Sequence, residues 1–187
     1  MDKQELRKKY KKLRLELTEK DHQFFSRGIE NNLLPLMANF NVVHTFLPIA
    51  KLKEFDTFKL IENPKLNHIQ WFTSIVNELG GLEHVDVWPK MEYVLDSWSI
   101  PIPLTKKEAD LPKVELVLVP LLCIDKNGNR IGYGKGYYDG FLSTLSPTTQ
   151  FCGISFFDPI EESINTEAHD IPLHMCVTPN QIINFKN

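Results

Sequence analysis

The stretch "VELVLVPLLCIDKNGNRIGYGKGYYDG", residues 114–140, joins the most apolar run of the chain to its densest group of glycines. Its first part, residues 114–124, is rich in Val and Leu and is followed by the turn-forming "DKNGN". Such a run is typical of a strand that is covered on both faces. Five glycines follow between Gly128 and Gly140, although glycine costs about 0.5 to 1 kcal/mol more to order than alanine. The stretch therefore predicts a buried central strand, a glycine-rich loop and a short helix over residues 137–145.

Two helices are expected before this stretch, at the N-terminus of the chain. Residues 3–17 carry an apolar stripe among lysines and arginines, formed by Leu6, Leu13 and Leu17 with Tyr10 beside it. A capping-box pattern, Thr18 followed by Asp21, begins a second helix, which is expected to end or kink near Pro35.

Strand patterns and one further helix alternate along the rest of the chain. The helix is predicted at residues 54–62, opened by Asp56 or Thr57, and residues 99–112 are expected to be the longest surface loop. Strands are predicted at 42–48, 66–75, 84–89, 150–157 and within 174–183, and 91–98 is a strand or irregular. This order predicts one three-layer α/β domain over residues 1–187, with a largely parallel open sheet flanked by helices.

Length and composition limit the classes of function. A chain of 187 residues with 42% apolar and 24% charged residues can bury about 70% of its extended surface, as ordinary globular proteins do. No stretch has the roughly 20 apolar residues of a membrane span and the N-terminus lacks a signal core, so we expect a cytoplasmic protein. The net charge of −3 argues against a protein built to neutralise nucleic acid. The three cysteines and six histidines lack metal-ligand spacing, so reduced thiols and structural histidines are expected.

The glycine-rich loop has the position of an anion site. Between a buried strand and a helix, backbone N–H groups can converge on a phosphate, and Arg130 and Lys135 add positive charge. Asp139 could hold magnesium, which takes one or two carboxylates besides phosphate oxygens. The glycines alternate at Gly132, Gly134 and Gly136, a spacing that is neither GxGxxG nor a P-loop. Spacing alone leaves a phosphate site and a structural turn both open.

At family level, "VPLLCIDKNGNRIGYGKGYYDGFL", residues 119–142, resembles the signature of the 5-formyltetrahydrofolate cyclo-ligases, roughly VP-x(3)-FD-x(2)-G-x-RLG-x-G-x-GYYD-x(2)-L. Three other segments resemble the same family: "KQELR" with Lys3 and Arg7, "KEFDT" with Glu54 and Thr57, and "NTEAHD" ending in Asp170. The chain departs from the pattern at Ile124, where the family usually has Phe, and at Ile102-Pro103, where it commonly has Glu-Pro.

The resemblance implies an activity and a set of site residues. The activity is the ATP- and magnesium-dependent cyclisation of 5-formyltetrahydrofolate to 5,10-methenyltetrahydrofolate with release of ADP and phosphate, by way of a phosphorylated formyl group. The implied catalytic residues are Arg130, Tyr133 and Lys135, the magnesium ligands Asp139 and Asp170, and the substrate contacts Leu47, Glu54, Tyr133 and Tyr137. The implied ATP contacts are Lys3, Arg7, Gly128, Asn129, Arg130, Gly132, Gly134, Lys135 and Gly136.

Two other classes of function remain as alternatives. A nucleic-acid binder could use the basic N-terminal helix, although its basic residues are not interleaved with a stacking platform. The second alternative is a different phosphoryl-transfer enzyme, or a family member that binds folate without turning it over. The expected partners are small molecules, ATP and folate, with no nucleic acid and no membrane, and the expected state is a monomer.

Overall fold

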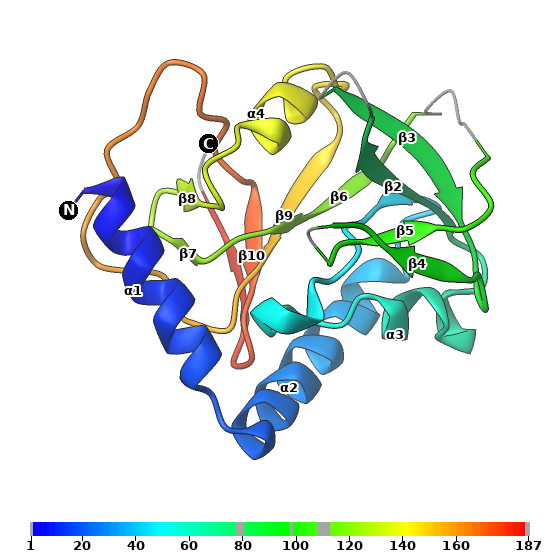
Figure 1. The fold of residues 1–187 in the computed structure, drawn as a ribbon. Helices are drawn as coiled ribbons and strands as arrows, with labels where there is room; N and C mark the ends of the chain where they lie inside the picture. Colours follow the sequence, from blue (N-terminus) through cyan, green and yellow to red (C-terminus); the bar gives the residue numbers. More distant parts are fainter. Residues whose placement is uncertain (1, 78–80, 98, 108–112, 186–187) are drawn as a thin grey trace.

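A seven-stranded, mostly parallel sheet forms the centre of the computed structural model, which describes residues 2–77, 81–97, 99–107 and 113–185 (Figure 1). The strand order is β11-β10-β9-β6-β1-β2-β3. The parallel strands are β1 (Val42–His44), β2 (Gln70–Val76), β6 (Leu116–Pro120), β9 (Gln150–Ile154) and β10 (Met175–Val177). At the edges β3 (Leu82–Val87) and β11 (Ile182–Asn184) pair antiparallel. The expected α/β fold is confirmed, with β6 at the middle of the sheet.

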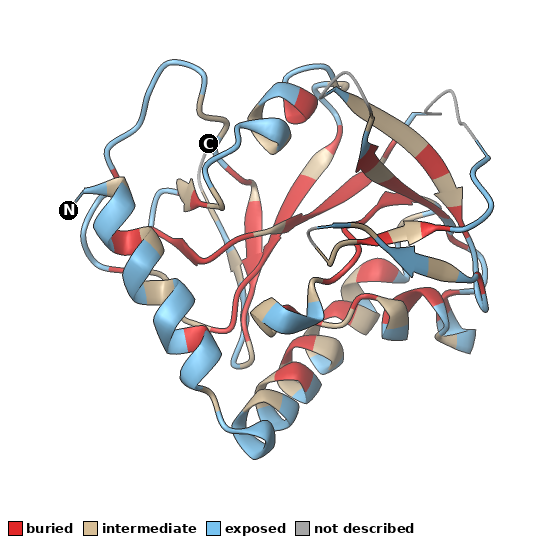
Figure 2. Cartoon of the chain, viewed as in Figure 1, coloured by how far each residue is buried: buried red, intermediate tan, exposed pale blue. Residues whose placement is uncertain are grey.

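Helices cover both faces of this sheet. They are α1 (Lys3–Glu16), α2 (Glu19–Met37), α3 (Phe58–Ile61) and α4 (Tyr137–Leu142), with short 3-10 turns at η1 (Ala50–Leu52) and η2 (Pro64–Leu66). On β6, Leu116 and Leu118 face the core beneath α2 and α3, while Val117 and Val119 face α4. Because side chains alternate across a strand, β6 contributes to the core on both faces of the sheet, and Figure 2 shows it buried along most of its length.

The apolar run of residues 114–124 is not one strand, contrary to expectation. β6 ends at Pro120, and the chain then leaves the sheet to form a separate hairpin of β7 (Cys123–Ile124) and β8 (Arg130–Ile131). Proline has no N–H to continue a ladder, which favours the end of the strand there. The glycine loop, defined here as residues 132–136, therefore follows a hairpin and not the central strand directly.

Several other boundaries differ from the predictions. The strand expected over 42–48 ends at His44, and the helix expected over 54–62 has only the four residues of α3. The end of the second helix agrees with the prediction, since α2 ends at Met37, two residues after Pro35. Proline removes one N–H from the helical ladder and crowds the preceding turn, which favours an end of the helix close to it. The capping box is confirmed, with the Asp21 amide donating to Thr18 Oγ1 at 3.1 Å.

Two regions contain more strand than the sequence predicted. Part of the expected loop 99–112 is β5 (Pro101–Pro103), which pairs antiparallel with β4 (Tyr93–Leu95). Residues 98 and 108–112, which also belong to these predictions, lie outside the described residues. Near the C-terminus one strand was expected, but β10 and β11 form a hairpin. None of the helices in the described part of the chain has the length and hydropathy of a membrane span.

Helix α1 packs through only part of the predicted stripe, with Tyr10 and Leu17 partly buried against the core clusters. Leu6 is buried as expected, but Leu13 is 38% exposed, whereas Arg14 is only 4% exposed. An apolar stripe would have placed Leu13 inward, so the polar contacts of Arg14, described below, decide the rotation of the helix.

Candidate functional site

Helix α1 brings a row of cations to the glycine loop. Lys3, Arg7 and Arg14 are separated by four and seven residues and therefore lie on one face of the helix. Lys3 Nζ lies 2.7 Å from Asp170 Oδ2, and Arg7 Nε donates to the Gly132 carbonyl at 2.9 Å. Further along, Arg14 donates to the Leu121 carbonyl at 3.2 Å and to the Tyr133 hydroxyl. One helix thus touches the loop, an acidic segment and the chain just after β6.

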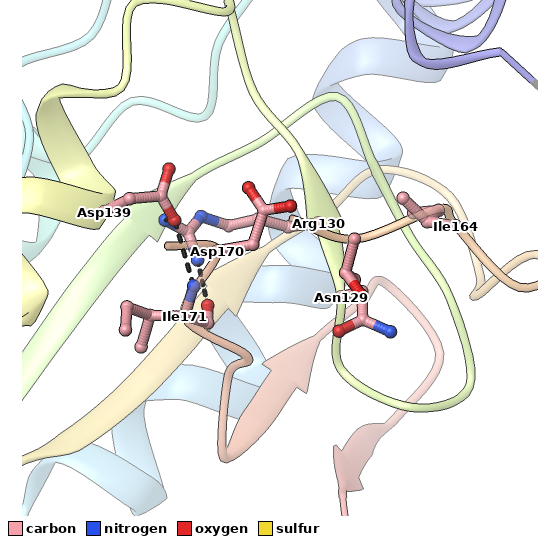
Figure 3. Close-up of a pocket in the computed structure, with 7 residues that line it drawn as sticks. Asn129, Arg130, Asp139, Ile164, Asp170 and Ile171 are labelled. Atoms are coloured by element: carbon pink, nitrogen blue, oxygen red, sulfur yellow. Dashed lines mark hydrogen bonds and ion pairs between the residues drawn. The ribbon is translucent and has the colours of Figure 1, made fainter. Parts of the chain in front are cut away.

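A small polar cavity, the carboxylate cavity, lies at the N-terminal end of α1 (Figure 3). It is lined by Asn129, Arg130, Asp139, Ile164, Thr166, Asp170 and Ile171. Arg130 Nη2 lies 2.7 Å from Asp139 Oδ1, its Nη1 donates to the Ile171 carbonyl, and the Ile171 amide donates to Asp139 Oδ1 at 3.1 Å. Arg130, Asp139 and Asp170, predicted from separate segments, are therefore brought together.

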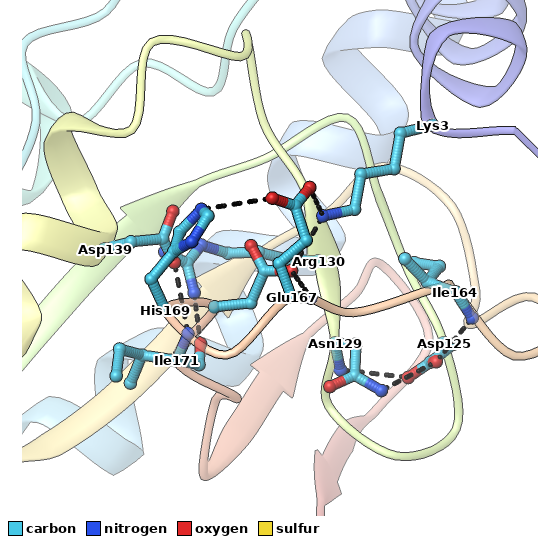
Figure 4. Close-up of polar contacts among 10 residues, drawn as sticks. Lys3, Asp125, Asn129, Arg130, Asp139, Ile164, Glu167, His169 and Ile171 are labelled. Atoms are coloured by element: carbon cyan, nitrogen blue, oxygen red, sulfur yellow. Dashed lines mark hydrogen bonds and ion pairs between the residues drawn. The ribbon is translucent and has the colours of Figure 1, made fainter.

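Ion pairs join this cavity to α1 and adjust its charges (Figure 4). Lys3 also lies 3.1 Å from Glu167, and the Glu167 amide donates to Asp170 Oδ2 at 2.7 Å. Burial opposes ionisation of Asp170, but the hydrogen bonds from Lys3 and from the Glu167 amide lower its pKa below the ordinary value. Burial lowers the pKa of Arg130, against the opposing effect of Asp139.

The two aspartates suit magnesium only as part of a larger ligand set. Each makes its contacts with the described residues through one oxygen, Oδ1 of Asp139 and Oδ2 of Asp170, which leaves the other oxygen available. Within the described ranges no three His, Cys, Asp or Glu side chains are grouped as metal ligands. Mg²⁺ commonly binds one or two carboxylates and takes its other ligands from water and phosphates. The residues fit that mode and not an all-protein cage.

Asp125, which was not among the predicted site residues, organises the loop in front of the carboxylate cavity. It is fully buried, and its carboxylate accepts hydrogen bonds from the amides of Asn127, Asn129 and Ile164 and from the Asn129 side chain. Asp125 thus connects the hairpin turn to the segment that carries Asp170. An aspartate directly before "KNGN" was the available signal, since Asp often hydrogen-bonds the backbone two residues on.

A second cavity, the aromatic cavity, lies toward the C-terminal end of α1. Its lining residues are Arg14, Phe46, Glu54, Phe55, Pro120, Leu121, Ile154 and Phe156. Glu54 Oε2 accepts from the Ile49 amide at 2.7 Å, and Glu54 Oε1 accepts from the Tyr133 hydroxyl. Burial raises the pKa of Glu54, and the Ile49 amide, Tyr133 and Arg14 oppose that shift. Glu54 and Tyr133 were both predicted to contact the substrate. They are 79 residues apart in the sequence, and the structure joins them by a hydrogen bond.

The remaining predicted residues are distributed around these cavities. Lys135 is exposed and makes no hydrogen bond or ion pair with the described residues, while Tyr137 is 37% exposed at the start of α4. Leu47 is buried in the main core, and neither it nor Tyr137 lines either cavity. Thr57, the last residue of "KEFDT", donates to the Phe46 carbonyl at 2.6 Å and so has a structural contact.

The glycines of the site differ in what a side chain would meet. Gly128 (φ +83°) lies against the Leu173 carbonyl, and a Cβ there would be 2.6 Å from that oxygen, so its role is to turn the chain. Gly134 (φ +86°) lies against Arg7, whose Cζ would be 3.0 Å from a Cβ. At Gly132 a Cβ would meet nothing within 4 Å among the described residues. Gly132 therefore has open space beside it, where a ligand could approach the backbone.

Comparison with known proteins identifies the family of this chain. A family model described as the 5-formyltetrahydrofolate cyclo-ligase family matches residues 1–179. The chain belongs to this family. Curated 5-formyltetrahydrofolate cyclo-ligases are similar to it, at 30% identity over 106 residues for Escherichia coli and 26% over 158 residues for Mycoplasma pneumoniae. The match covers 55% of this chain and 58% of the E. coli protein, and 83% of this chain and 86% of the M. pneumoniae protein.

Some of the curated matches cover only part of the relative. A Mycolicibacterium smegmatis cyclo-ligase matches at 32% identity over 69 residues, which is 37% of this chain and 36% of the relative. The chain thus spans roughly a third to three fifths of the M. smegmatis and E. coli relatives.

Solved structures extend the similarity to the whole cyclo-ligase fold. The NMR structure of Aquifex aeolicus 5,10-methenyltetrahydrofolate synthetase has a TM-score of 0.83 at 25% identity and covers 100% of this chain and 94% of that one. A 5,10-methenyltetrahydrofolate synthetase from M. pneumoniae has a TM-score of 0.74 at 20% identity, covering 96% and 99% of the two chains, and supports the fold alone.

Proposed function

We propose that this chain converts 5-formyltetrahydrofolate and ATP to 5,10-methenyltetrahydrofolate, ADP and phosphate. The formyl oxygen attacks the γ-phosphorus, and the bond from that phosphorus to ADP breaks. N10 of the folate then attacks the activated carbon, the C–O bond breaks with release of phosphate, and N10 loses its proton. The protein positions the two substrates and neutralises charge, which are the main contributions to phosphoryl transfer.

One observation carries the proposal: a single face of α1 reaches the carboxylate cavity, the glycine loop and the aromatic cavity in turn. This arrangement puts a phosphate-compatible region next to a region walled by Phe46, Phe55 and Phe156, and it suits a nucleotide beside a folate. Family membership and the similar A. aeolicus synthetase support the same reaction.

The nucleotide phosphates would lie along the glycine loop. Lys3, Arg7, Arg130 and Lys135 supply positive charge, while the backbone of Gly132, Gly134 and Gly136 offers N–H groups without a bulky side chain. The amide and side chain of Asn129 both donate to Asp125, so Asn129 would hold the turn beside the phosphates. Gly128, packed against Leu173, would act by shaping this backbone. Lys135 is the cation we assign to the transferred phosphoryl group, because it is free to move toward it.

Asp139 and Asp170 would hold magnesium between them and the phosphates. When bound, the ion supplies charge neutralisation on the phosphate oxygens. Asp170 would bind through Oδ1, since its contacts with Lys3 and the Glu167 amide use Oδ2, and Lys3 can in addition exchange its contact for a phosphate oxygen. Lys3 and Asp170 are both about one quarter exposed, at 23% and 25%, so the exchange costs little desolvation.

Glu54 and Tyr133 would bind the pterin of the folate. A carboxylate accepts hydrogen bonds from the amino and ring N–H groups of such a ring, and Leu47 and Tyr137 are the proposed further contacts. Each cavity has a volume of only about 10 Å³, room for about one water molecule. Both substrates must therefore lie on the open surface beside the cavities or displace residues that line them. We propose a cytoplasmic monomer for this activity.

The proposal is tested by following the methenyl chromophore after mixing the protein with 5-formyltetrahydrofolate, ATP and magnesium. We expect product only when all components are present. Omission of ATP or chelation of magnesium should abolish it, and ADP should appear in a one-to-one ratio with product. A folded protein that forms no chromophore, or that hydrolyses ATP without using folate, would contradict the proposal and favour a different phosphoryl-transfer enzyme.

A further inference from the structure

Arg14 is the buried cation of the aromatic cavity, and the sequence motifs do not include it. Its side chain is buried, it donates to Leu121 and Tyr133, and its Nε has no hydrogen-bond partner among the described residues. A buried guanidinium is costly unless it is compensated.

The rotation of α1 is consistent with a role at the site. Arg14 follows Lys3 by 11 residues, close to three turns, and so lies on the same face as Lys3 and Arg7. Lys11 and Leu13, close by in the sequence, are exposed. The buried side of the helix therefore carries Arg14 as well as Leu6, with Lys3 and Arg7 partly buried beside them.

Hydrogen-bond chemistry gives the contacts of Arg14 a direction. A guanidinium can only donate, so the Tyr133 hydroxyl accepts from Arg14 and must turn its own proton toward Glu54 Oε1. The other oxygen of Glu54 accepts from the Ile49 amide. Both oxygens of Glu54 are consequently held as acceptors, and no alternative orientation of the hydroxyl satisfies both neighbours.

We propose that Arg14 is a positioning residue, which sets the direction of the Tyr133 hydroxyl and thereby keeps Glu54 an ionised acceptor for N–H donors of a heteroaromatic ring. This inference rests on the proposed function, because it takes the folate ring as the ligand of the aromatic cavity. The charged and titratable groups that face Glu54 are Arg14 of α1, Tyr133 of the glycine loop and Tyr138 of α4. Burial raises the pKa of Glu54, and the hydrogen bonds from the Ile49 amide and Tyr133 oppose this rise most, with the positive charge of Arg14 adding to them.

The experiment compares Arg14→Met with Lys11→Met, a matched change at an exposed residue of the same helix. Calorimetry measures binding of 5-formyltetrahydrofolate and, separately, of magnesium-ATP. For Arg14→Met we expect about tenfold weaker folate binding, while the affinity for magnesium-ATP changes by less than about twofold. Lys11→Met should match wild type for both ligands.

The pH dependence of folate binding supplies a readout that packing would not change. Without Arg14, Glu54 takes up its proton more readily, so folate affinity should begin to fall at a higher pH than in wild type. Tyr133→Phe removes the bridging hydroxyl, and adding Arg14→Met to it should cost much less than Arg14→Met costs alone. Arg14→Lys, which keeps the charge but cannot hold both acceptors, should lie between Arg14→Met and wild type.

These results also separate the two proposals. Wild-type protein that does not bind 5-formyltetrahydrofolate overturns the proposed function. Wild-type binding combined with an Arg14→Met protein that only melts at a lower temperature, with unchanged folate affinity and pH dependence, overturns the role of Arg14. Should Arg14→Met not fold, Arg14→Lys decides the matter, and wild-type folate affinity in that variant overturns the inference.

Discussion

The two ends of α1 hold the site by different means. At the N-terminal end Lys3 pairs with Asp170 and Glu167, and all three side chains are 23% exposed or more. At the C-terminal end Arg14 is 4% exposed and is hydrogen-bonded to a tyrosine that contacts a carboxylate only 6% exposed. Exposed ion pairs contribute little to stability and can be exchanged, whereas removing one partner of a buried group leaves the other uncompensated.

Because of this difference, substitutions at the N-terminal end of α1 should mainly change ligand binding, whereas substitutions at the C-terminal end should also change stability. A ligand can replace the contacts of Lys3 at small cost, so that end suits the phosphates and metal of a nucleotide. The contacts of Arg14, Tyr133 and Glu54 must be kept while the ligand is bound, so that end suits a rigid ring. Four predictions test the distinction, beginning with the largest expected effect.

Lys135→Met should lower kcat by about a hundredfold to a thousandfold, the usual cost of losing one group that stabilises transition-state charge. Its melting temperature should not change, since the side chain is exposed and has no partner among the described residues. Steady-state kinetics and a thermal melt measure the two effects, with Lys65→Met, an exposed lysine of η2, as the control. Wild-type kcat in Lys135→Met would remove this residue from the mechanism.

Asp139→Asn and Asp170→Asn should weaken magnesium-ATP binding alike, by at least about tenfold, if both carboxylates hold the ion. Their effects on stability should differ. Arg130, whose side chain is 6% exposed, loses its partner in Asp139→Asn, which should cost about 2 kcal/mol of unfolding free energy. Loss of the partly exposed Lys3–Asp170 pair in Asp170→Asn should lower the unfolding free energy by less than about 1 kcal/mol.

Urea unfolding and calorimetry on the two aspartate variants measure these quantities. Equal loss of stability in both variants would contradict the prediction that the more buried pair, Arg130–Asp139, contributes more to stability than Lys3–Asp170 does. An unchanged affinity for magnesium-ATP in either one would exclude that carboxylate as a magnesium ligand.

Glu54→Gln should change how stability depends on pH. Because burial raises the pKa of Glu54, the folded state binds its proton more tightly than the unfolded state does. The free energy of unfolding therefore decreases as pH rises from the ordinary glutamate value through the raised one, and this decrease should disappear in Glu54→Gln. Urea unfolding across this pH range measures it, and identical curves for wild type and variant would contradict the prediction.

The smallest expected effect separates two glycines of the same loop. Gly134→Ala combines a positive φ with a contact to Arg7, a strain of about 1 kcal/mol that should lower the melting temperature by a few degrees. Gly132→Ala meets open space and should melt like wild type. If the loop cradles phosphate, Gly132→Ala should nevertheless lose affinity for magnesium-ATP. Unchanged affinity there would favour the structural-turn interpretation of the alternating glycines.

Local patterns in the sequence predicted the elements of the fold well and their limits less well. The Val- and Leu-rich run predicted the central strand, because burial on both faces requires a continuous apolar segment, and the alternation of patterns predicted a parallel sheet. The break after Pro120 and the pairing of β4 with β5 were not predicted. Strand pairing depends on partners distant in the sequence, which a local pattern does not specify.

For the site, the motif residues were visible in the sequence, but their neighbours were not. The resemblance carried by residues 119–142 named Arg130, Lys135 and Asp139. Only the tertiary structure places Arg14 against Tyr133, 119 residues away, and so turns Leu13 outward. The helical period shows which residues share a face. Which residues are buried also depends on the polar groups that the rest of the fold places against the helix. Here the Leu121 carbonyl, just after β6, and the Tyr133 hydroxyl of the glycine loop accept hydrogen bonds from Arg14, and Arg14 is buried beside Leu6.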